Sequence, residues 1–431
     1  MVWKKMPKSY QKSDIKNPQN KYVFTNGTVV LDSKLVEFQR LAYTIQLGEQ
    51  TYGYTGSVMP VWVTDPVEYN KIGTEMEDAL SSLLDSQVGI NFRKDNGLIP
   101  YTQTQFNQTK FDFICLFSGG LDSSSFALQN ASKKKSGILH HTITHDNPFG
   151  KAKKLYQKYF LSCNNLKFVT TRGDNKVLNP AYLKTRGLIF LTNVLCIASQ
   201  LKIEEIVIPE NGPFMINLNV SPVAEPTRTT DPNMLEDWTI IFNKVTNSKV
   251  KINMPFKTST KSEVILFSGS KSLINDTWSC SHYQGLSKMC GLCNSCLVRI
   301  LSCYAICEGE NIESMYEDNP FLVKSNKLKN SNKNSYRISI DAIDFWASII
   351  NPDNSRNDIE KQKFDSINSL YPVMTKHALD MFLGFKKLSQ VYNSSEPLFS
   401  HFNKTLQKID ASQLKTRSEE LEREKHIRRW S

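Results

Sequence analysis

The middle of the chain alternates apolar runs of strand length with helix-like segments, and this alternation restricts the fold more than any other feature. An apolar run at 111–117 is followed by a helix that begins after Asp122. Later elements of the same two kinds are predicted at 138–144, 151–160, 166–170, 183–201 and 205–208. Repeated strand–helix units produce a parallel sheet that helices cover on both faces. We therefore predict an α/β core over residues 109–323, with ligands bound beyond the carboxyl ends of the strands.

Two further regions flank this predicted core. Residues 1–108 predict a mixed α/β extension, with a hairpin turn at 26–27 and a helix at 73–84, where apolar residues recur at helical spacing. Residues 336–431 predict a mainly helical C-terminal region. The polar, low-complexity segment 324–335 between core and C-terminal region predicts a linker or an exposed loop.

The segment between the first strand and its helix carries the clearest chemical signal. It consists of Ser118, Gly119, Gly120, Leu121, Asp122, Ser123 and Ser124. The two glycines permit a tight turn that a ligand can approach closely. The start of the helix offers free N–H groups and a positive dipole end to an anion. The serine hydroxyls add donors, and Asp122 can orient the loop or hold Mg²⁺ beside phosphate oxygens. An ordinary capped Gly-Gly turn is the alternative, but the complete pattern favours a phosphate site.

Four of the nine cysteines lie close together in the sequence. They are Cys280, Cys290, Cys293 and Cys296, separated by nine, two and two residues. In a chain without a secretory signal, such a cluster indicates metal binding rather than disulfides. Four thiolates provide the closed tetrahedral site of structural Zn²⁺. An iron–sulfur cluster or a redox pair is the alternative, and His282 inside the cluster is predicted to be a bystander.

The formal net charge of +11 raises the expectation of a polyanionic partner such as a nucleotide. The basic residues are scattered, however, and their clearest clusters at 133–135 and 151–154 are most simply solvated helix faces or loops. No basic patch interleaved with aromatic residues indicates a nucleic acid partner. No apolar run approaches the roughly 20 residues that span a membrane, and the N-terminus lacks a secretory signal. We therefore expect a soluble, cytoplasmic protein.

The motifs together resemble one known family. The loop lacks the Gly-Lys-Ser/Thr of a Walker loop and is similar to that of the PP-loop ATPases, which cleave ATP between the α and β phosphates. After it follow Thr260-Lys261-Ser262-Glu263, then Thr277-Trp278-Ser279-Cys280, then Cys290-x-x-Cys293-x-x-Cys296-x-x-Arg299. This order resembles the 7-cyano-7-deazaguanine synthase (QueC) family over about residues 109–310. The resemblance implies the PP-loop, adenine nucleotide α-hydrolase-like fold for the core.

The resemblance also implies an activity and a set of site residues. Members of the family are ATP-dependent C–N ligases, which activate 7-carboxy-7-deazaguanine with ATP and then add ammonia. By resemblance, residues 118–124 hold the phosphates of ATP with Mg²⁺, and the four cysteines hold Zn²⁺. Lys261 is expected near the nucleotide, where it offsets charge on the phosphates. Arg186, which stands where the family has an Arg-Asn pair, is the third catalytic candidate beside Asp122 and Lys261. For Arg186 and Lys261 the alternative is a charge on a helix surface.

The chain departs from the family pattern on the expected substrate side. Residues 145–150, His-Asp-Asn-Pro-Phe-Gly, replace the family's Tyr-Gly-Gln-Arg-His, and Arg186-Gly187 replaces its Arg-Asn. About 110 residues precede the core and about 100 follow it. QueC-like proteins with such extensions resemble the QatC type encoded in bacterial anti-phage operons, where a partner protein's amine can replace ammonia. The resemblance thus implies adenylation of a deazaguanine, with ammonia or a protein from the same operon as acceptor. A tRNA sulfur transferase and a non-catalytic nucleotide-binding defence subunit are the competing interpretations.

Overall fold

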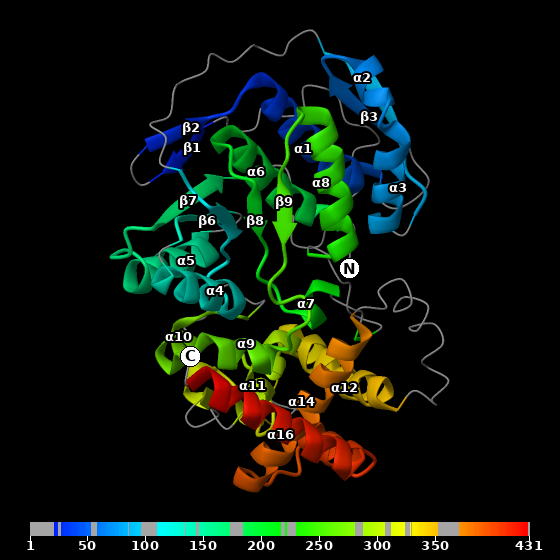
Figure 1. Ribbon diagram of the computed structural model, residues 1–431. Coiled ribbons are helices and arrows are strands. Elements are labelled where there is room, and N and C mark those ends of the chain that lie inside the picture. The colour runs from blue at the N-terminus through cyan, green and yellow to red at the C-terminus, as the bar shows by residue number, and fades with distance from the viewer. Residues whose placement is uncertain are drawn as a thin grey trace.

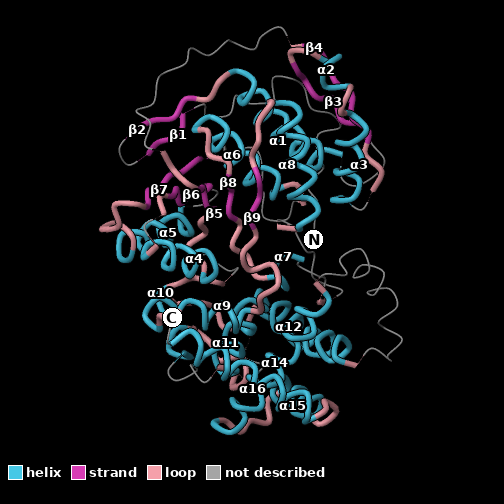
Figure 2. The backbone as a smooth tube through the Cα atoms, in the orientation of Figure 1, coloured by secondary structure: helices cyan, strands magenta, loops and turns pink. Residues whose placement is uncertain are grey.

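The protein consists of an α/β half and a helical half, which Figure 1 shows one above the other. Figure 2 shows the strands confined to the α/β half. The computed structural model describes residues 21–24, 27–52, 58–84, 86–95, 110–133, 135–143, 146–172, 184–216, 220–221, 230–280, 288–306, 312–323, 328, 330–351 and 370–429. Every helix in these ranges is too short or too polar to cross a lipid bilayer.

The main sheet has seven strands in the order β2-β1-β7-β6-β5-β8-β9. The strands are β1 (Lys21–Phe24), β2 (Gly27–Val30), β5 (Phe113–Leu116), β6 (Gly137–Ile143), β7 (Leu166–Arg172), β8 (Glu205–Val207) and β9 (Lys251–Asn253). The five from β7 to β9 are parallel, which confirms the predicted α/β core. The hairpin predicted around residues 26–27 is present as β1 and β2, and it pairs antiparallel with the edge of β7. Chain progression reverses between β5 and β8, and ligands bind at such a point in sheets of this type.

Helices cover both faces of the sheet because alternate strand residues point to opposite sides. Phe113, Cys115 and Phe117 pack against α4 (Leu121–Ser132) and α5 (Asp146–Tyr159). Ile114, between them, belongs to the core of the other face. That face is covered by α1 (Ser33–Tyr52), α6 (Arg186–Leu201) and α8 (Pro232–Thr246). Strand β5 is thus buried on both sides, and its carboxyl end leads directly into the glycine loop.

The N-terminal extension has a small sheet of its own. Strands β3 (Val58–Val63) and β4 (Gly89–Lys94) pair in parallel and are connected through α2 (Pro66–Asn70) and α3 (Gly73–Leu84). Helix α3 spans the predicted residues, and its four buried side chains are those that recur at helical spacing. The extension shares an apolar core with α6 and α8, so this region packs against the α/β core.

The other half of the molecule consists of helices. They are α9 (Lys261–Ser268), α10 (Lys271–Asp276), α11 (Asn294–Ala305), the 3₁₀ turn η3 (Ile312–Met315), α12 (Asn330–Ile350), α14 (Tyr371–Val391), α15 (Pro397–Leu406) and α16 (Ala411–Arg429), with the short α7 (Gly212–Ile216) next to the sheet. A continuous apolar core joins α11 to α12, α14 and α15. The C-terminal helices therefore pack directly on the segment that carries the cysteine cluster.

One expectation about this half is wrong. The segment 324–335 is polar and predicts a linker, but α12 begins at Asn330 and includes its second half. Ser335 and Ser339 are buried on this helix, and the hydroxyl of Ser339 donates to the carbonyl of Leu292 at 2.9 Å. Small polar side chains satisfied by the backbone of the neighbouring segment can lie in a core. Tertiary packing here overrides what composition suggests.

Candidate active site

The predicted phosphate loop forms a tight turn at the carboxyl end of β5. Gly119 has a φ of +75°, and a Cβ there would lie 2.8 Å from the Cα of Ala152. The amide of Gly120 donates to the hydroxyl of Ser118 at 3.1 Å, and the hydroxyls of Ser118 and Ser123 lie 3.3 Å apart. Ser118 is exposed to solvent. The loop is held in shape by its own serines while its outer edge stays open to a ligand.

Asp122 and Lys261, predicted from separate motifs, are in direct contact. The ammonium of Lys261 lies 2.7 Å and 2.8 Å from the two carboxylate oxygens of Asp122. The side chain of Asn211 donates to the same carboxylate at 2.7 Å, and its amide does so at 3.2 Å. Burial raises the pKa of Asp122, but the charge of Lys261 and the hydrogen bonds outweigh it and lower the pKa overall. Because both oxygens are engaged, the geometry favours the orienting role of Asp122.

Lys261 is fixed by its position at the start of α9. The hydroxyl of Thr260 accepts from the amide of Glu263 at 3.3 Å, and the carboxylate of Glu263 accepts from the amide of Thr260 at 2.9 Å. This reciprocal capping box satisfies free donors of the first turn and sets where the helix begins. Only 9% of the Lys261 side chain is exposed. The alternative interpretation of Lys261 as a helix-surface charge is therefore wrong.

Glu210 is a site residue that sequence reasoning missed. It follows β8 and lies next to Asp122, with its carboxylate 3.2 Å from the side-chain nitrogen of Asn211 that also binds Asp122. Desolvation of the carboxyl group, followed by the negative charge of Asp122, raises the pKa of Glu210 to about 8. Two adjacent carboxyl groups share a proton in this way when both cannot ionise. The signal was available, because a Glu-Asn pair lies one residue beyond a predicted strand at the ligand-binding edge of the sheet.

Lys151 and Trp278 are two further neighbours of the loop. The ammonium of Lys151 lies over the face of the Trp278 ring, and burial lowers the pKa of Lys151 to about 8. The next residue, Ala152, is the one that closes on Gly119. The amide of Trp278 donates to the carbonyl of Gly119 at 3.4 Å. The sequence alone favours a solvated helix face or loop for the basic cluster at 151–154. In the structure, this cluster places one cation beside the phosphate loop.

Several buried polar atoms around the Asp122–Lys261 pair have no hydrogen-bond partner among the described residues. They are the hydroxyls of Ser124 and Ser262 and the side-chain oxygen of Asn211. All three residues are fully buried. Buried polar groups are nearly always satisfied in native proteins, by ordered water if not by protein. The pair therefore lies in a polar region suited to water or to ligand oxygens.

The four predicted cysteines converge on one point. Their sulfurs lie within 4.8 Å of one another, and all four residues are buried. Cys280–Cys293, Cys290–Cys296 and Cys293–Cys296 have sulfur separations of 4.0, 3.9 and 3.4 Å. Tetrahedral coordination with Zn–S bonds of about 2.3 Å separates the sulfurs by about 3.8 Å. The residues thus fit a closed zinc site.

The cysteine cluster and the phosphate loop are connected through the residues before Cys280. The indole of Trp278 donates to the carbonyl of Cys280 at 3.1 Å, while its amide reaches Gly119. Arg299, from the last part of the cysteine motif, donates to the carbonyl of Thr277 at 3.1 Å and to the hydroxyl of Ser279 at 3.0 Å. Hydrogen bonds of residues 277–280 therefore connect the cysteine cluster with the loop.

The structure describes only some of the remaining predicted residues. Arg186 begins α6, and its guanidinium lies 5.1 Å from the ring of Phe190 on the same helix. Its catalytic role stays a prediction. His282 and His145 lie outside the described residues, as do the side chains of residues 146 and 147.

Comparisons with known proteins indicate the same family that the sequence motifs resemble. The family model described as "Queuosine biosynthesis protein QueC" matches residues 154–305, which include Lys261 and all four cysteines. The 7-cyano-7-deazaguanine synthase of Picrophilus torridus is 28% identical over 241 residues, which are 50% of this chain and 96% of that protein. Over this part of its length, the chain is therefore similar to the QueC family, a family of ATP-dependent ligases.

Proposed function

We propose that the protein adenylates a 7-deazaguanine substrate with ATP, on a PP-loop fold, for attack by a nitrogen nucleophile. The observation that carries this proposal is the buried contact of Asp122 and Lys261 beside a preformed glycine loop at the carboxyl end of β5. The relative named 7-cyano-7-deazaguanine synthase supports the choice of substrate class.

Each residue has a stated task in this proposal. Residues 118–124 bind the phosphates of ATP, with Mg²⁺ neutralising phosphate charge. Lys261 stabilises charge that develops when a substrate carboxylate attacks the α-phosphorus and pyrophosphate leaves. Asp122 keeps the ammonium of Lys261 in place at 2.7 Å. The nitrogen nucleophile then attacks the activated carbon and releases AMP. The four cysteines hold Zn²⁺, which supports the fold and takes no part in these steps.

The nitrogen acceptor is the finer part of the proposal. We propose a protein amine from the same operon, in anti-phage defence, because the family's Gln-Arg-His segment is replaced at residues 145–150 and large regions flank the core. Specific interfaces bury about 800 Å² per partner, which such regions can provide. Free ammonia in an ordinary biosynthetic synthase is the alternative. The packing of both flanking regions on the core favours this alternative.

Product analysis tests the reaction class. After incubation with ATP and 7-carboxy-7-deazaguanine, we expect AMP and pyrophosphate, and no AMP from the folded Asp122→Asn variant. ADP and orthophosphate alone would refute adenylation, and no turnover of any kind would favour a non-catalytic nucleotide-binding subunit. Intact mass spectrometry of co-expressed operon proteins then separates the acceptors. A covalent mass increase supports a protein amine, and efficient conversion to the free nitrile with ammonia refutes it.

A further inference from the structure

The last helix of the chain reaches the helix that carries Lys261. Arg417 of α16 is almost completely buried, with 1% of its side chain exposed. Its Nε lies 2.7 Å from a carboxylate oxygen of Asp380 on α14, and its Nη2 lies 2.8 Å from Glu263 on α9. Its Nη1 lies 2.8 Å from Glu420 on its own helix. A single guanidinium thus connects three helices of the C-terminal half.

One of the carboxylates held by Arg417 also belongs to the cap of α9. Glu263 is one member of the capping box, and the other, Thr260, donates its hydroxyl to Asp380 at 2.6 Å. Lys261 directly follows the N-cap and is the first residue of α9. A shift of Arg417 would therefore move both capping residues, and the ammonium of Lys261 would lose its fixed distance to Asp122.

Helix α14 contacts the site from the same side. A Cβ on Gly212, the residue after Asn211, would lie 2.9 Å from the side chain of Val373. His377, one turn further along α14, is buried, and its pKa is lowered to about 3 by burial and then by the charges of Lys261 and Arg417. His377 is therefore neutral and does not compete for the carboxylates of this network. The C-terminal region forms one wall of the site.

We propose that Arg417 is a positioning residue for Lys261, which makes the C-terminal helices part of the ATP-activating apparatus. The catalytic side of this inference rests on the proposed adenylation. Arg417 touches neither the loop nor Asp122 in the contacts described, so it acts through Thr260 and Glu263. Its role is to hold the first turn of α9 at the position that suits the phosphates.

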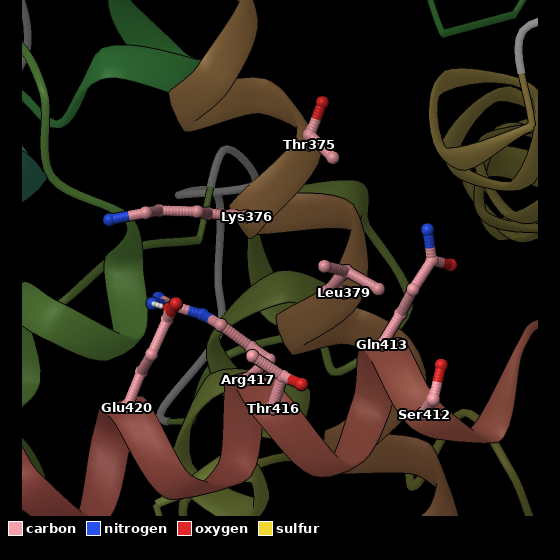
Figure 3. A pocket seen from close by; sticks show the side chains of 8 residues that line it. All are labelled: Thr375, Lys376, Leu379, Ser412, Gln413, Thr416, Arg417 and Glu420. Atoms are coloured by element: carbon pink, nitrogen blue, oxygen red, sulfur yellow. Dashed lines mark hydrogen bonds and ion pairs between the residues drawn. The ribbon is translucent and has the colours of Figure 1, made fainter.

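A cavity adjoins this network. Figure 3 shows that it lies between α14 and α16, with the side chains of Arg417 and Glu420 directed toward each other. Its volume is about 240 Å³, and it is lined by Thr375, Lys376, Leu379, Ser412, Gln413, Thr416, Arg417 and Glu420. Shortening Arg417 to alanine would open this space toward Asp380 and Glu263. A guanidinium ion added to the solution could then occupy the vacated place.

The test combines chemical rescue with a double-mutant cycle. Arg417→Ala is expected to lower kcat for AMP formation by about ten- to a hundredfold, the effect of a displaced catalytic group. Guanidinium chloride at non-denaturing concentration should restore part of this rate, whereas the same concentration of sodium chloride should not. In the Lys261→Met background, Arg417→Ala should cause little further loss, because residues that act through one another are not additive. Arg423→Ala, an exposed arginine of the same helix, is the matched control.

Each alternative outcome is distinct. If Arg417→Ala loses stability but keeps its kcat, or if its loss is fully additive with that of Lys261→Met, Arg417 is only structural and the proposal fails. If Arg417→Ala does not fold, Asp380→Asn, which keeps a hydrogen bond to Thr260, replaces it in the cycle. If the wild-type protein forms no AMP, the proposed function fails. The cycle is then measured on ATP binding by calorimetry, where the same non-additivity is expected and additivity again refutes the positioning role.

Discussion

Replacing Lys261 with methionine should leave the carboxylate of Asp122 buried without its counter-ion. The two side chains are 9% and 6% exposed, so water screens the pair little. Removing one partner of a buried ion pair costs about 3–5 kcal/mol of stability. The two hydrogen bonds from Asn211 remain, which places the expected loss near the lower end, at about 3 kcal/mol.

The loss should depend on pH, with a definite sign. In the wild-type protein the pKa of Asp122 is lowered, so the stability from the pair is complete above the usual carboxyl pKa and is lost only as the pH falls through the lowered value. In the variant, burial acts without the ammonium and raises the pKa. The carboxyl group then takes up a proton at a higher pH, and the difference from wild type shrinks on acidification.

Urea unfolding at pH 5 and pH 8 measures this effect. Lys244→Met is the control, because Lys244 and Glu75 form an ion pair that is 49% and 48% exposed. Such exposed pairs contribute about 0–1 kcal/mol. Equal losses for Lys261→Met at both pH values, or a loss no larger than that of the control, would refute the buried-charge argument. The double variant with Asp122→Asn should recover most of the stability, since no unpaired charge remains.

Three other predictions follow from the same geometry. Cys293→Ala should lower both metal content and melting temperature; elemental analysis of the wild type should show one zinc per chain, and iron with sulfide would overturn the zinc assignment. Gly384→Ala should destabilise the protein by about 1–3 kcal/mol or more, as overpacking does, because its Cβ would lie 2.0 Å from the carbonyl oxygen of Leu301. Gly150→Ala is the control and should be neutral or stabilising, because among the described residues, apart from its chain neighbours and its own helix backbone, no atom lies within 4 Å of the added Cβ. Equal effects of the two changes would contradict the packing. Glu210→Gln should leave stability unchanged below about pH 4. It should raise stability relative to wild type as the pH increases toward 8, because the raised pKa of Glu210 makes its ionisation unfavourable in the folded protein. Parallel melting curves across this range would exclude that cause.

Features encoded by short sequence patterns were predictable. The alternation of strand and helix gives the parallel core, and the boundaries of α3 follow from four buried residues at helical spacing. The cysteine cluster is also encoded locally, by Cys-x-x-Cys spacing and by one distant partner. In these cases the local sequence determines the geometry, because spacing along a helix or a tight turn determines which side chains converge.

Residues that act through long-range contacts were not predictable from pattern alone. Lys151 belongs to a basic cluster, and the sequence of this cluster does not indicate that the ammonium of Lys151 lies over the ring of Trp278. Arg417 lies in a highly charged helix, and only packing distinguishes it from its exposed neighbours. The start of α12 was missed because the burial of Ser339 depends on the backbone at Leu292. A single sequence records none of these pairings.

The contacts of the site span much of the chain, and this has a consequence for synthesis of the protein. Asp122 is made early, Lys261 follows 139 residues later, and Arg417 pairs with Glu263 across a further 154 residues. At roughly 5–20 residues per second, a ribosome needs about 15–60 s to pass from Asp122 to Arg417. Until Lys261 is made, Asp122 lacks its ammonium partner. Until Arg417 is made, the cap of α9 lacks its guanidinium partner. If Arg417 positions Lys261 as proposed, a nascent or truncated chain cannot assemble the complete site, and ATP activation requires that the last helix has been made and packed.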